Sequence, residues 1–218
     1  MFTLLVRQVL HFLGENDGRE WLLKRLPKHS VGAEIGVYGG RFSKLILRIV
    51  RPRKLHLIDP WKYEADPTYE RSLYGGSQGQ SQARMDAMYE SVVKTFQSRR
   101  VEIHREDSAA CSARFPDNYF DWIYMDGNHQ YEFVKQDLEL YLPKVKSEGL
   151  VAGDDYAQDP NNWTKDGVTR AVNETIQTGL YGKIVTDDRT HQFLLRKSQV
   201  AQPQRDRAEV SSGLGYTA

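Results

Sequence analysis

Three aspartates follow apolar segments in the second half of the chain. Asp126 comes after Trp122–Met125, and Asp154 and Asp155 come after Gly149–Gly153. Neighbouring carboxylates repel one another strongly unless a cation lies between them. Three oxygen ligands with room for water suit Mg²⁺ or a similar hard divalent ion better than zinc. The pattern therefore predicts a divalent-metal site. The structural alternative is that Asp154 or Asp155 caps the next segment and that Asp126 pairs with a lysine.

A histidine lies three residues beyond the first of these aspartates. A lone histidine is usually structural, but His129 would stand beside the proposed metal at the start of the next helical segment. An imidazole has an ordinary pKa of about 6.5, which suits it to exchange protons near neutral pH. His129 is therefore a candidate for proton transfer.

The first apolar segment ends in a glycine-rich turn that contains Gly36 and Gly40, with the acidic Glu34 just before it. Glycines between a strand and a helix let the backbone approach a ligand at the positive end of the helix. The alternative is a tight turn without a ligand. A dinucleotide fingerprint would need glycine where Tyr38 and Arg41 stand, and a phosphate-binding Walker loop is absent.

Two further acidic positions follow strand-like segments. Asp59 ends the segment Lys-Leu-His-Leu-Ile-Asp, where a carboxylate can accept hydrogen bonds from the vicinal hydroxyls of a ribose. Its alternative is a helix cap or a turn acid before Pro60. Asp107 and Ser108 follow Val101–His104, where they could contact an adenine, although the residues alone favour a helix cap.

These side chains need a scaffold of alternating elements. We expect strands at 31–37, 54–59, 101–104, 120–126, 149–154, 183–186 and 192–196. We expect helices at 42–50, 81–96, 108–114, 131–142 and 167–178. This alternation predicts an α/β fold with right-handed crossovers, a mostly parallel sheet with helices on both faces, and a C-terminal antiparallel hairpin. Ligands of such sheets bind at the carboxyl ends of the strands.

The remaining segments divide the chain. We expect an N-terminal helical extension over residues 1–29, one main domain over 30–197 and a flexible polar tail over 198–218. Residues 66–80 form a long polar insertion after the second strand, and long loops often serve as lids or binding loops. Trp61 and three tyrosines lie in or just before this insertion, where they could stack on a substrate ring or simply pack: Tyr63, Tyr69 and Tyr74.

The composition narrows the function classes. The 218 residues carry 30 Lys and Arg against 29 Asp and Glu, a balance that argues against a nucleic-acid partner. The single cysteine, Cys111, excludes an intramolecular disulfide framework and a cysteine-based zinc cluster. No apolar stretch is long enough to span a membrane, and the N-terminus lacks the features of a signal peptide. We expect a cytoplasmic globular protein.

Together these residues resemble the class I S-adenosylmethionine-dependent methyltransferases. Within that class they resemble the bacterial metal-dependent O-methyltransferases of the macrocin O-methyltransferase (TylF-like) and cephalosporin-hydroxylase-like group. The resemblance covers about residues 30–197 and lies in four motifs: Ala-Glu-Ile-Gly-Val-Tyr-Gly-Gly-Arg-Phe-Ser (33–43), Leu-Ile-Asp-Pro-Trp (57–61), Met-Asp-Gly-Asn-His-Gln-Tyr (125–131) and Gly-Leu-Val-Ala-Gly-Asp-Asp-Tyr (149–156). Tyr38 replaces the middle glycine of the first motif.

The resemblance implies a Rossmann-like sheet of seven strands and a role for each candidate residue. Cofactor binding would fall to Glu34, Gly36 and Gly40 at the methionine part, Asp59 at the ribose, Asp107 and Ser108 near the adenine, and Asp126 close by. Asp126, Asp154 and Asp155 would bind the metal, and His129 would be the general base.

The implied activity is methyl transfer from S-adenosylmethionine to a hydroxyl group of a small molecule, such as a sugar or a glycosylated natural product. A divalent cation would make that hydroxyl easier to deprotonate, and His129 would accept the proton. The alternatives are a nitrogen acceptor on the same scaffold, and a non-catalytic cofactor-binding or regulatory subunit. The N-terminal helices could serve as a surface for a homo-oligomer or as a lid.

Overall fold

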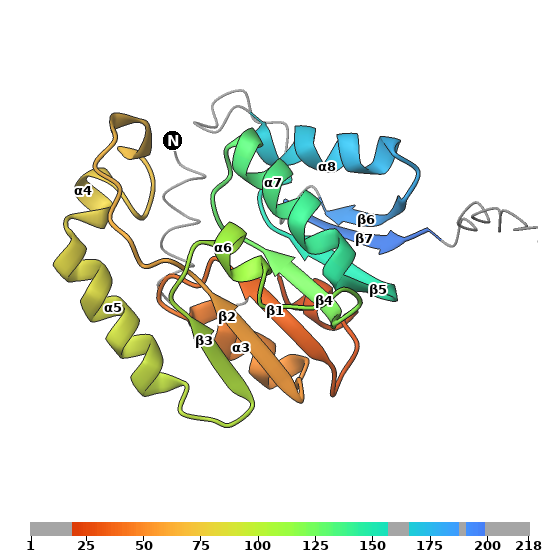
Figure 1. Cartoon of the computed structure of the whole chain (residues 1–218), viewed down its shortest axis with the longest axis horizontal. Coiled ribbons are helices and arrows are strands. Elements are labelled where there is room, and N and C mark those ends of the chain that lie inside the picture. Colours follow the sequence, from red (N-terminus) through yellow and green to blue (C-terminus); the bar gives the residue numbers. More distant parts are fainter. Residues whose placement is uncertain (1–18, 157–165, 188–190, 199–218) are drawn as a thin grey trace, which may run out of the picture.

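The computed structural model describes residues 19–156, 166–187 and 191–198. They form one sheet of seven strands in the order β3-β2-β1-β4-β5-β7-β6 (Figure 1). The strands are β1 (Val31–Ile35), β2 (Lys54–Ile58), β3 (Val101–His104), β4 (Phe120–Met125), β5 (Val145–Gly153), β6 (Tyr181–Asp187) and β7 (Gln192–Lys197). Strands β1 to β5 pair in parallel, and β7 pairs antiparallel with both β5 and β6. The expected mostly parallel sheet with a C-terminal antiparallel hairpin is confirmed.

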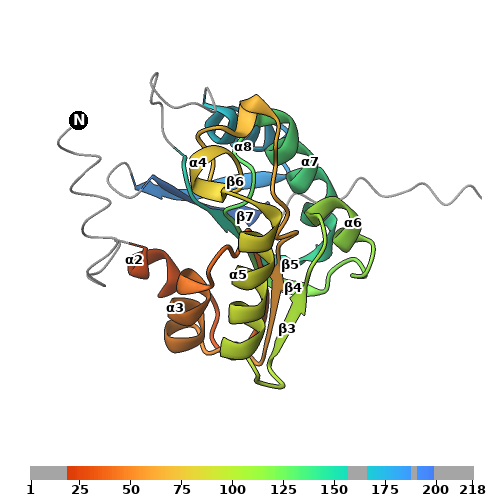
Figure 2. The ribbon, with the colours of Figure 1, turned by 90° about the vertical axis from the view of Figure 1, so that its left-hand side faces the viewer.

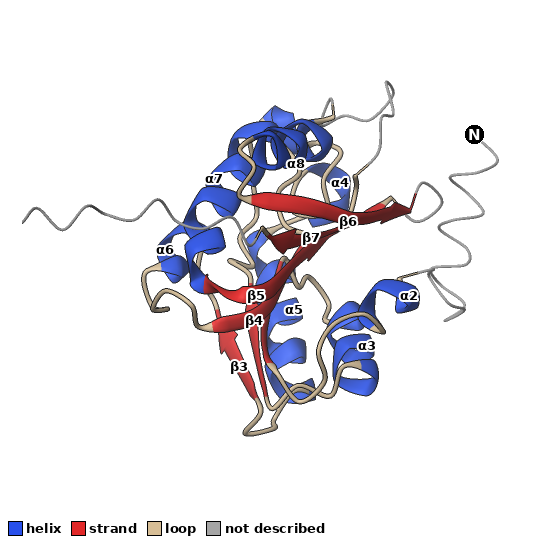
Figure 3. Ribbon diagram, turned by 90° about the vertical axis from the view of Figure 1, so that its right-hand side faces the viewer, coloured by secondary structure: helices blue, strands red, loops and turns tan. Residues whose placement is uncertain are grey.

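Helices cover both faces of this sheet. The α-helices are α2 (Glu20–Leu23), α3 (Arg41–Ile49), α4 (Gly76–Gly79), α5 (Gln82–Thr95), α6 (Ser108–Ser112), α7 (Tyr131–Tyr141) and α8 (Gly167–Gln177). Two short 3₁₀ turns are η1 (Pro67–Tyr69) and η2 (Leu142–Lys144). Figures 2 and 3 show α2, α3 and α5 on one side of the sheet and α6, α7 and α8 on the other.

Each helix layer has its own apolar core. In α7, Val134, Leu138 and Tyr141 recur at helical spacing, so the helix turns one apolar face to the sheet. On the opposite face, Leu22 and Leu23 of α2 pack with the side chains of α3 and α5. The described part of the N-terminal extension is therefore built into the core beside the main domain.

The observed elements agree with the expected ones apart from their ends. The largest difference is β5, which begins at Val145 rather than Gly149. Residues 146–148 are polar and not buried, so the start of this strand carries no apolar signal. The expected tail over 198–218, apart from Ser198, and residues 1–18 of the expected N-terminal extension lie outside the described residues. No helix in the described ranges is long and apolar enough to cross a bilayer.

The insertion after β2 folds back on itself. The N-terminus of η1 is capped by Asp66, whose carboxylate accepts a hydrogen bond from the Thr68 amide at 2.8 Å. A bridge then pairs Glu64 with Gly75, which closes the loop before α4. This closure brings the aromatic residues of the insertion back to the tips of the strands.

Candidate active site

The glycine-rich turn joins β1 to α3 at the centre of the sheet. Gly36 has a φ of +87°, and a Cβ atom there would lie 2.0 Å from the Asp126 carbonyl oxygen at the tip of β4. Gly40, the N-cap of α3, has a φ of +71° and would clash with the Phe96 ring. Packing and backbone conformation therefore explain both glycines. A Cβ on Gly39 would meet open space, so the turn is open at this residue.

Glu34 lies on β1 beneath this turn and is 1% exposed. Its Oε2 accepts a hydrogen bond of 2.6 Å from the Ser43 hydroxyl of α3. Burial raises the pKa of Glu34 to about 8, although the Ser43 hydrogen bond favours the charged form. The side chain is thus a buried, mostly protonated carboxyl at neutral pH.

The carboxylate of Asp59, at the tip of β2, is held by four donors. Its Oδ2 accepts from the amides of Val37 and Tyr38, each at 2.8 Å, and from the Tyr74 hydroxyl, while Oδ1 accepts from the Trp61 amide at 2.7 Å. Burial raises the pKa of Asp59 despite these donors. The position expected for a ribose hydroxyl is therefore taken by the phenol of Tyr74, which comes from the insertion.

Asp107 and Ser108 lie where β3 passes into α6. Asp107 is the exposed N-cap residue of α6, and its side chain makes no capping hydrogen bond. The Ser108 hydroxyl donates to Asp137 of α7 at 2.5 Å. Asp107 thus remains open to solvent, whereas Ser108 is engaged between two helices.

The tips of β4 and β5 bring the second group of predicted residues together. His129 Nδ1 lies 2.7 Å from Asp155 Oδ2, and its Nε2 lies 3.3 Å from Asp126 Oδ1. The Arg19 guanidinium lies 3.1 Å from Asp126 Oδ2 and 3.2 Å from Asp154 Oδ2. The three aspartates and the histidine therefore form one cluster, with an arginine on one side.

Arg19 is the member of this cluster that the sequence did not indicate. It precedes α2, is 9% exposed and stacks over the Phe42 ring at 4.3 Å from its centroid. Its ion pairs with Asp126 and Asp154 span 107 and 135 residues of sequence, so no local spacing could reveal them. Arg19 therefore supplies part of the positive charge that we expect between these carboxylates.

Three buried side-chain atoms have no hydrogen-bond partner among the described residues, and all three lie close to the ends of β4, β5 and β7. They are Nε2 of His129, Oδ1 of Asp154 and Oε1 of Gln192. His129 and Asp154 also line the same small pocket, together with Asn128, Asp137 and Phe193. Buried polar atoms normally find a partner, so these atoms mark a place where a polar ligand or an ion fits.

The charges in the cluster shift the protonation of its members. Burial alone would lower the pKa of His129, but the carboxylates of Asp126 and Asp155 raise it well above its ordinary value. Burial and the charge of Asp126 raise the pKa of Asp154 to about 7, against the lowering effect of Arg19. His129 therefore carries a proton in this state, and Asp154 titrates near neutrality.

Nine of the described non-glycine residues have a positive φ, and three of them follow strands at the candidate site. Tyr38, Trp61 and Asp155 follow β1, β2 and β5 with φ values of +50°, +43° and +57°, a region that side chains larger than glycine rarely adopt. Such outliers persist only where the surrounding structure over-determines them, which is typical of active sites.

The aromatic residues near the insertion have separate roles. Trp61 is fully buried and its ring nitrogen donates to the Tyr38 carbonyl at 2.8 Å, so it does not stack on a substrate. Tyr69 accepts from Asn128 Nδ2 at 2.9 Å, which ties the insertion to the loop after β4. Through Tyr69 and Tyr74 the insertion touches the tips of both β2 and β4.

Comparisons with known proteins agree with this fold and this edge of the sheet. Residues 33–156 match the family model described as a methyltransferase domain. No curated protein matches the chain. The O-methyltransferase NovP is similar in structure, with a TM-score of 0.58 and 19% identity over 83% of this chain and 80% of that chain.

Two further solved structures share the architecture. One is a Burkholderia thailandensis 1,6-didemethyltoxoflavin-N1-methyltransferase with bound S-adenosylhomocysteine, with a TM-score of 0.56 and 11% identity over 90% of this chain and 89% of that chain. The other is a Corynebacterium glutamicum protein, with a TM-score of 0.58 and 14% identity over 90% and 89%. At these identities the likeness establishes the fold alone.

The family model spans more than half of the chain, which therefore belongs to the methyltransferase domain family. By family the protein is therefore a methyltransferase.

Proposed function

We propose that this methyltransferase transfers the methyl group of S-adenosylmethionine to a hydroxyl of a small molecule, such as a sugar or a glycosylated natural product, and that it requires a divalent cation such as Mg²⁺. One observation carries the proposal. Buried oxygens of Asp154 and Gln192 that have no hydrogen-bond partner among the described residues lie beside a cluster of carboxylates at the carboxyl ends of the strands, where ligands of this fold class bind. The TylF-like subgroup is part of the same proposal and rests on the four motifs.

The cofactor would lie over the tips of β1 and β2. S-adenosylmethionine supplies an activated methyl on a sulfonium, so the protein's main contribution is alignment. The turn with Gly36 and Gly40, above the buried Glu34, would receive the methionine part. Asp59 would hold the ribose once Tyr74 gives way, because its Oδ2 already accepts from three donors. The exposed Asp107 next to Ser108 would lie toward the adenine, and Asp126 beside the methyl group.

The donor set at β4 and β5 fits a hard divalent cation. The Asp154 Oδ1 atom is buried and unpartnered, and carboxylates are the preferred ligands of Mg²⁺. Asp126, Asp154 and Asp155 would hold the ion, whose charge would lower the pKa of a nearby substrate hydroxyl. Arg19 pairs with Oδ2 of Asp126 and of Asp154, which leaves Oδ1 of Asp154 for the ion.

The proton of the acceptor hydroxyl would pass to His129 Nε2, which lies 3.3 Å from Asp126 Oδ1 without a well-formed hydrogen bond. Asp155 orients the imidazole through Nδ1 at 2.7 Å. The two aspartates hold His129 in its protonated form, which cannot accept a proton. Positive charge beside Asp126 and Asp155 would offset their effect and lower the pKa of His129 toward neutrality.

Turnover with labelled S-adenosylmethionine, Mg²⁺ and a panel of sugars and catechols tests the proposal. Excess chelator and Asp154→Asn should abolish methyl transfer, while calorimetry should show that S-adenosylhomocysteine still binds. His129→Ala should lower kcat by roughly 10²- to 10⁴-fold with little change in KM. Asp117→Asn is the matched control, because Asp117 is exposed and pairs only with Lys144 among the interactions described for it.

Each part of the proposal (the metal, the base and the cofactor) has a result that would contradict it. Full activity in excess chelator would rule out the metal, and a loss of substrate affinity alone in His129→Ala would rule out the base. Failure to bind S-adenosylhomocysteine would contradict the whole proposal.

A further inference from the structure

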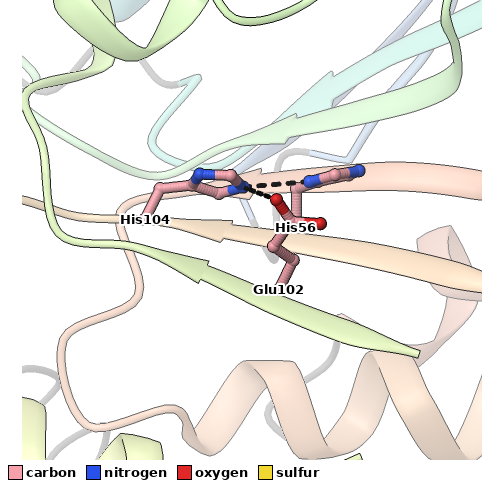
Figure 4. Close-up of side chains that lie close together, drawn as sticks. All are labelled: His56, Glu102 and His104. Carbon is pink, nitrogen blue, oxygen red and sulfur yellow. Dashed lines mark hydrogen bonds and ion pairs between the residues drawn. The ribbon is translucent and has the colours of Figure 1, made fainter. Parts of the chain in front are cut away.

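A second cluster of ligand-type side chains lies away from the strand tips just described. His56 of β2 and two residues of β3, Glu102 and His104, point toward one another on the same face of the sheet (Figure 4). His56 Nδ1 lies 3.0 Å from His104 Nε2, and that nitrogen lies 3.7 Å from Glu102 Oε1. Among the described residues this is the one group of three such side chains whose ligand atoms all lie within 4.8 Å of one another.

The register of the two strands creates this arrangement. His56 is the direct neighbour of Glu102 in the parallel pair, and His104 lies two residues further along β3 on the same face. His56 is 2% exposed and His104 is 8% exposed, beneath the rings of Phe115 and Phe120. The cluster is thus fixed by sheet geometry and by packing.

Hydrogen bonds outside the cluster orient two of its members. His56 Nε2 lies 3.1 Å from the Tyr119 hydroxyl, which leaves Nδ1 to face His104. Glu102 Oε2 lies 2.6 Å from Lys54 Nζ, which leaves Oε1 to face His104. Partners of this kind commonly orient the ligands of a metal site.

The two facing nitrogens of the histidine pair can hold either one N–H hydrogen or a cation between them. Burial lowers the pKa of His56 to about 4 and also lowers that of His104, so both rings are neutral at physiological pH. Two neutral ring nitrogens at 3.0 Å either share one proton or bind a common cation. A neutral imidazole is the form that binds a metal.

We propose that His56 Nδ1, His104 Nε2 and Glu102 Oε1 form a Zn²⁺ site that joins the edge strand β3 to β2. Zinc binds two imidazoles and a carboxylate at about 2.0–2.2 Å in tetrahedral geometry, so the two nitrogens would separate by a few tenths of an ångström. The Glu102 side chain is 47% exposed, and it leaves the fourth position and the entry path open to solvent. The mixed nitrogen and oxygen set favours zinc over Mg²⁺.

The site would act on the half of the sheet that carries the proposed cofactor contacts. The Asp59 amide donates to the His104 carbonyl at 3.1 Å, so a cation at His104 would hold the end of β3 against the tip of β2. Lys54 opposes the ion by charge, since its ammonium binds the other oxygen of Glu102. The bound ion would therefore stabilise the pairing of β3 with β2, and the positive charge of Lys54 would lower the affinity for the ion.

Calorimetric titration of the purified full chain with Zn²⁺ tests the inference. The Asp154→Asn variant serves as the parent, because it disables the carboxylate cluster at β4 and β5. One Zn²⁺ should bind to this parent and raise its unfolding temperature, and excess Mg²⁺ should not displace it. Adding Glu102→Gln should weaken binding at least tenfold, and His104→Gln should abolish it. Lys54→Gln should tighten binding, which a merely structural role of Lys54 would not do.

A control variant and a second metal ion test whether Zn²⁺ binds at the proposed site. Glu106→Gln changes a nearby, partly exposed glutamate that pairs with Arg114, and it should weaken Zn²⁺ binding far less than Glu102→Gln does. Co²⁺ bound in the parent should show the visible bands of a tetrahedral site, and Glu102→Gln should alter them. Absence of Zn²⁺ binding in the parent, or equal affinity in the Glu102→Gln and Glu106→Gln proteins, would overturn the inference and leave a shared proton between the histidines.

Discussion

The Glu34 carboxyl occupies one of the most buried positions in the sheet, yet it bonds only the Ser43 hydroxyl among the hydrogen bonds described for it. Burial raises its pKa from 4.5 to about 8, because the charged form loses its hydration. Its protonated form is therefore part of the fold at neutral pH. The stability of the turn between β1 and α3 should therefore depend on pH through Glu34.

This raised pKa predicts how stability changes with pH. Below pH 4.5 the carboxyl is protonated in both states, so its contribution is fully present. As the pH rises toward 8, the unfolded chain loses the proton while the folded chain keeps it, and the free energy of unfolding falls by roughly 1.4 kcal/mol per pH unit. Glu34→Gln cannot ionise and should remove this slope, so urea unfolding at pH 8 should show a more stable variant.

The comparison with Glu106→Gln isolates the effect of burial, because Glu106 is paired with Arg114 near the surface. That variant should keep the pH dependence of the parent between pH 4.5 and 8. If Glu34→Gln kept it as well, the raised pKa of Glu34 would be wrong.

At the scale of elements, the insertion between β2 and α5 contacts the carboxylate of Asp59, which we propose as the ribose ligand. The Tyr74 hydroxyl donates to Asp59 Oδ2 just as a ribose hydroxyl is expected to do. The insertion is anchored independently by Tyr69, which bonds Asn128. If Asp59 holds the ribose, the cofactor has to replace the Tyr74 contact, and this replacement should reduce its affinity.

Tyr74→Phe should tighten cofactor binding, because it removes the competing hydroxyl and keeps the ring. A hydrogen bond to a charged group contributes about 1.5–3 kcal/mol, which corresponds to a roughly 12- to 150-fold lower Kd for S-adenosylhomocysteine by calorimetry. Tyr69→Phe is the matched control and should leave Kd unchanged. Weaker binding in Tyr74→Phe would show that the tyrosine supports the cofactor instead of excluding it.

At the scale of the whole molecule, local sequence patterns predicted most of the fold but only part of the candidate site. The alternation of segments predicted the sheet, and the strand ends predicted where Asp126, His129 and Asp154 would meet. Contacts between distant segments could not be predicted. His56 and His104 are brought together by the strand register across 48 residues. Arg19 reaches Asp126 from an extension that showed only helical periodicity.

The Arg19 contacts tie the N-terminal extension to the carboxylates of the proposed reaction centre, and this link can be tested. Arg19 is 11% exposed at its side chain, between Asp126 at 24% and Asp154 at 17%. Arg19→Met keeps contact with the Phe42 ring but leaves two facing carboxylates without their counter-charge. Breaking a buried ion pair costs about 3–5 kcal/mol, and partial exposure places the loss near the lower end of that range.

The loss of stability in Arg19→Met should depend on whether Mg²⁺ is present. If Asp126, Asp154 and Asp155 hold a cation, Mg²⁺ should restore more of the unfolding temperature in Arg19→Met than it adds to the wild type, because the ion replaces the missing charge. Arg48→Met is the control. Its side chain is 65% exposed and pairs with Glu20 of α2, so it should change stability by less than about 1 kcal/mol and show no Mg²⁺ effect. An equal response to Mg²⁺ in both variants would show that Arg19 does not balance the charge of the carboxylate cluster. The extension would then have only a structural role.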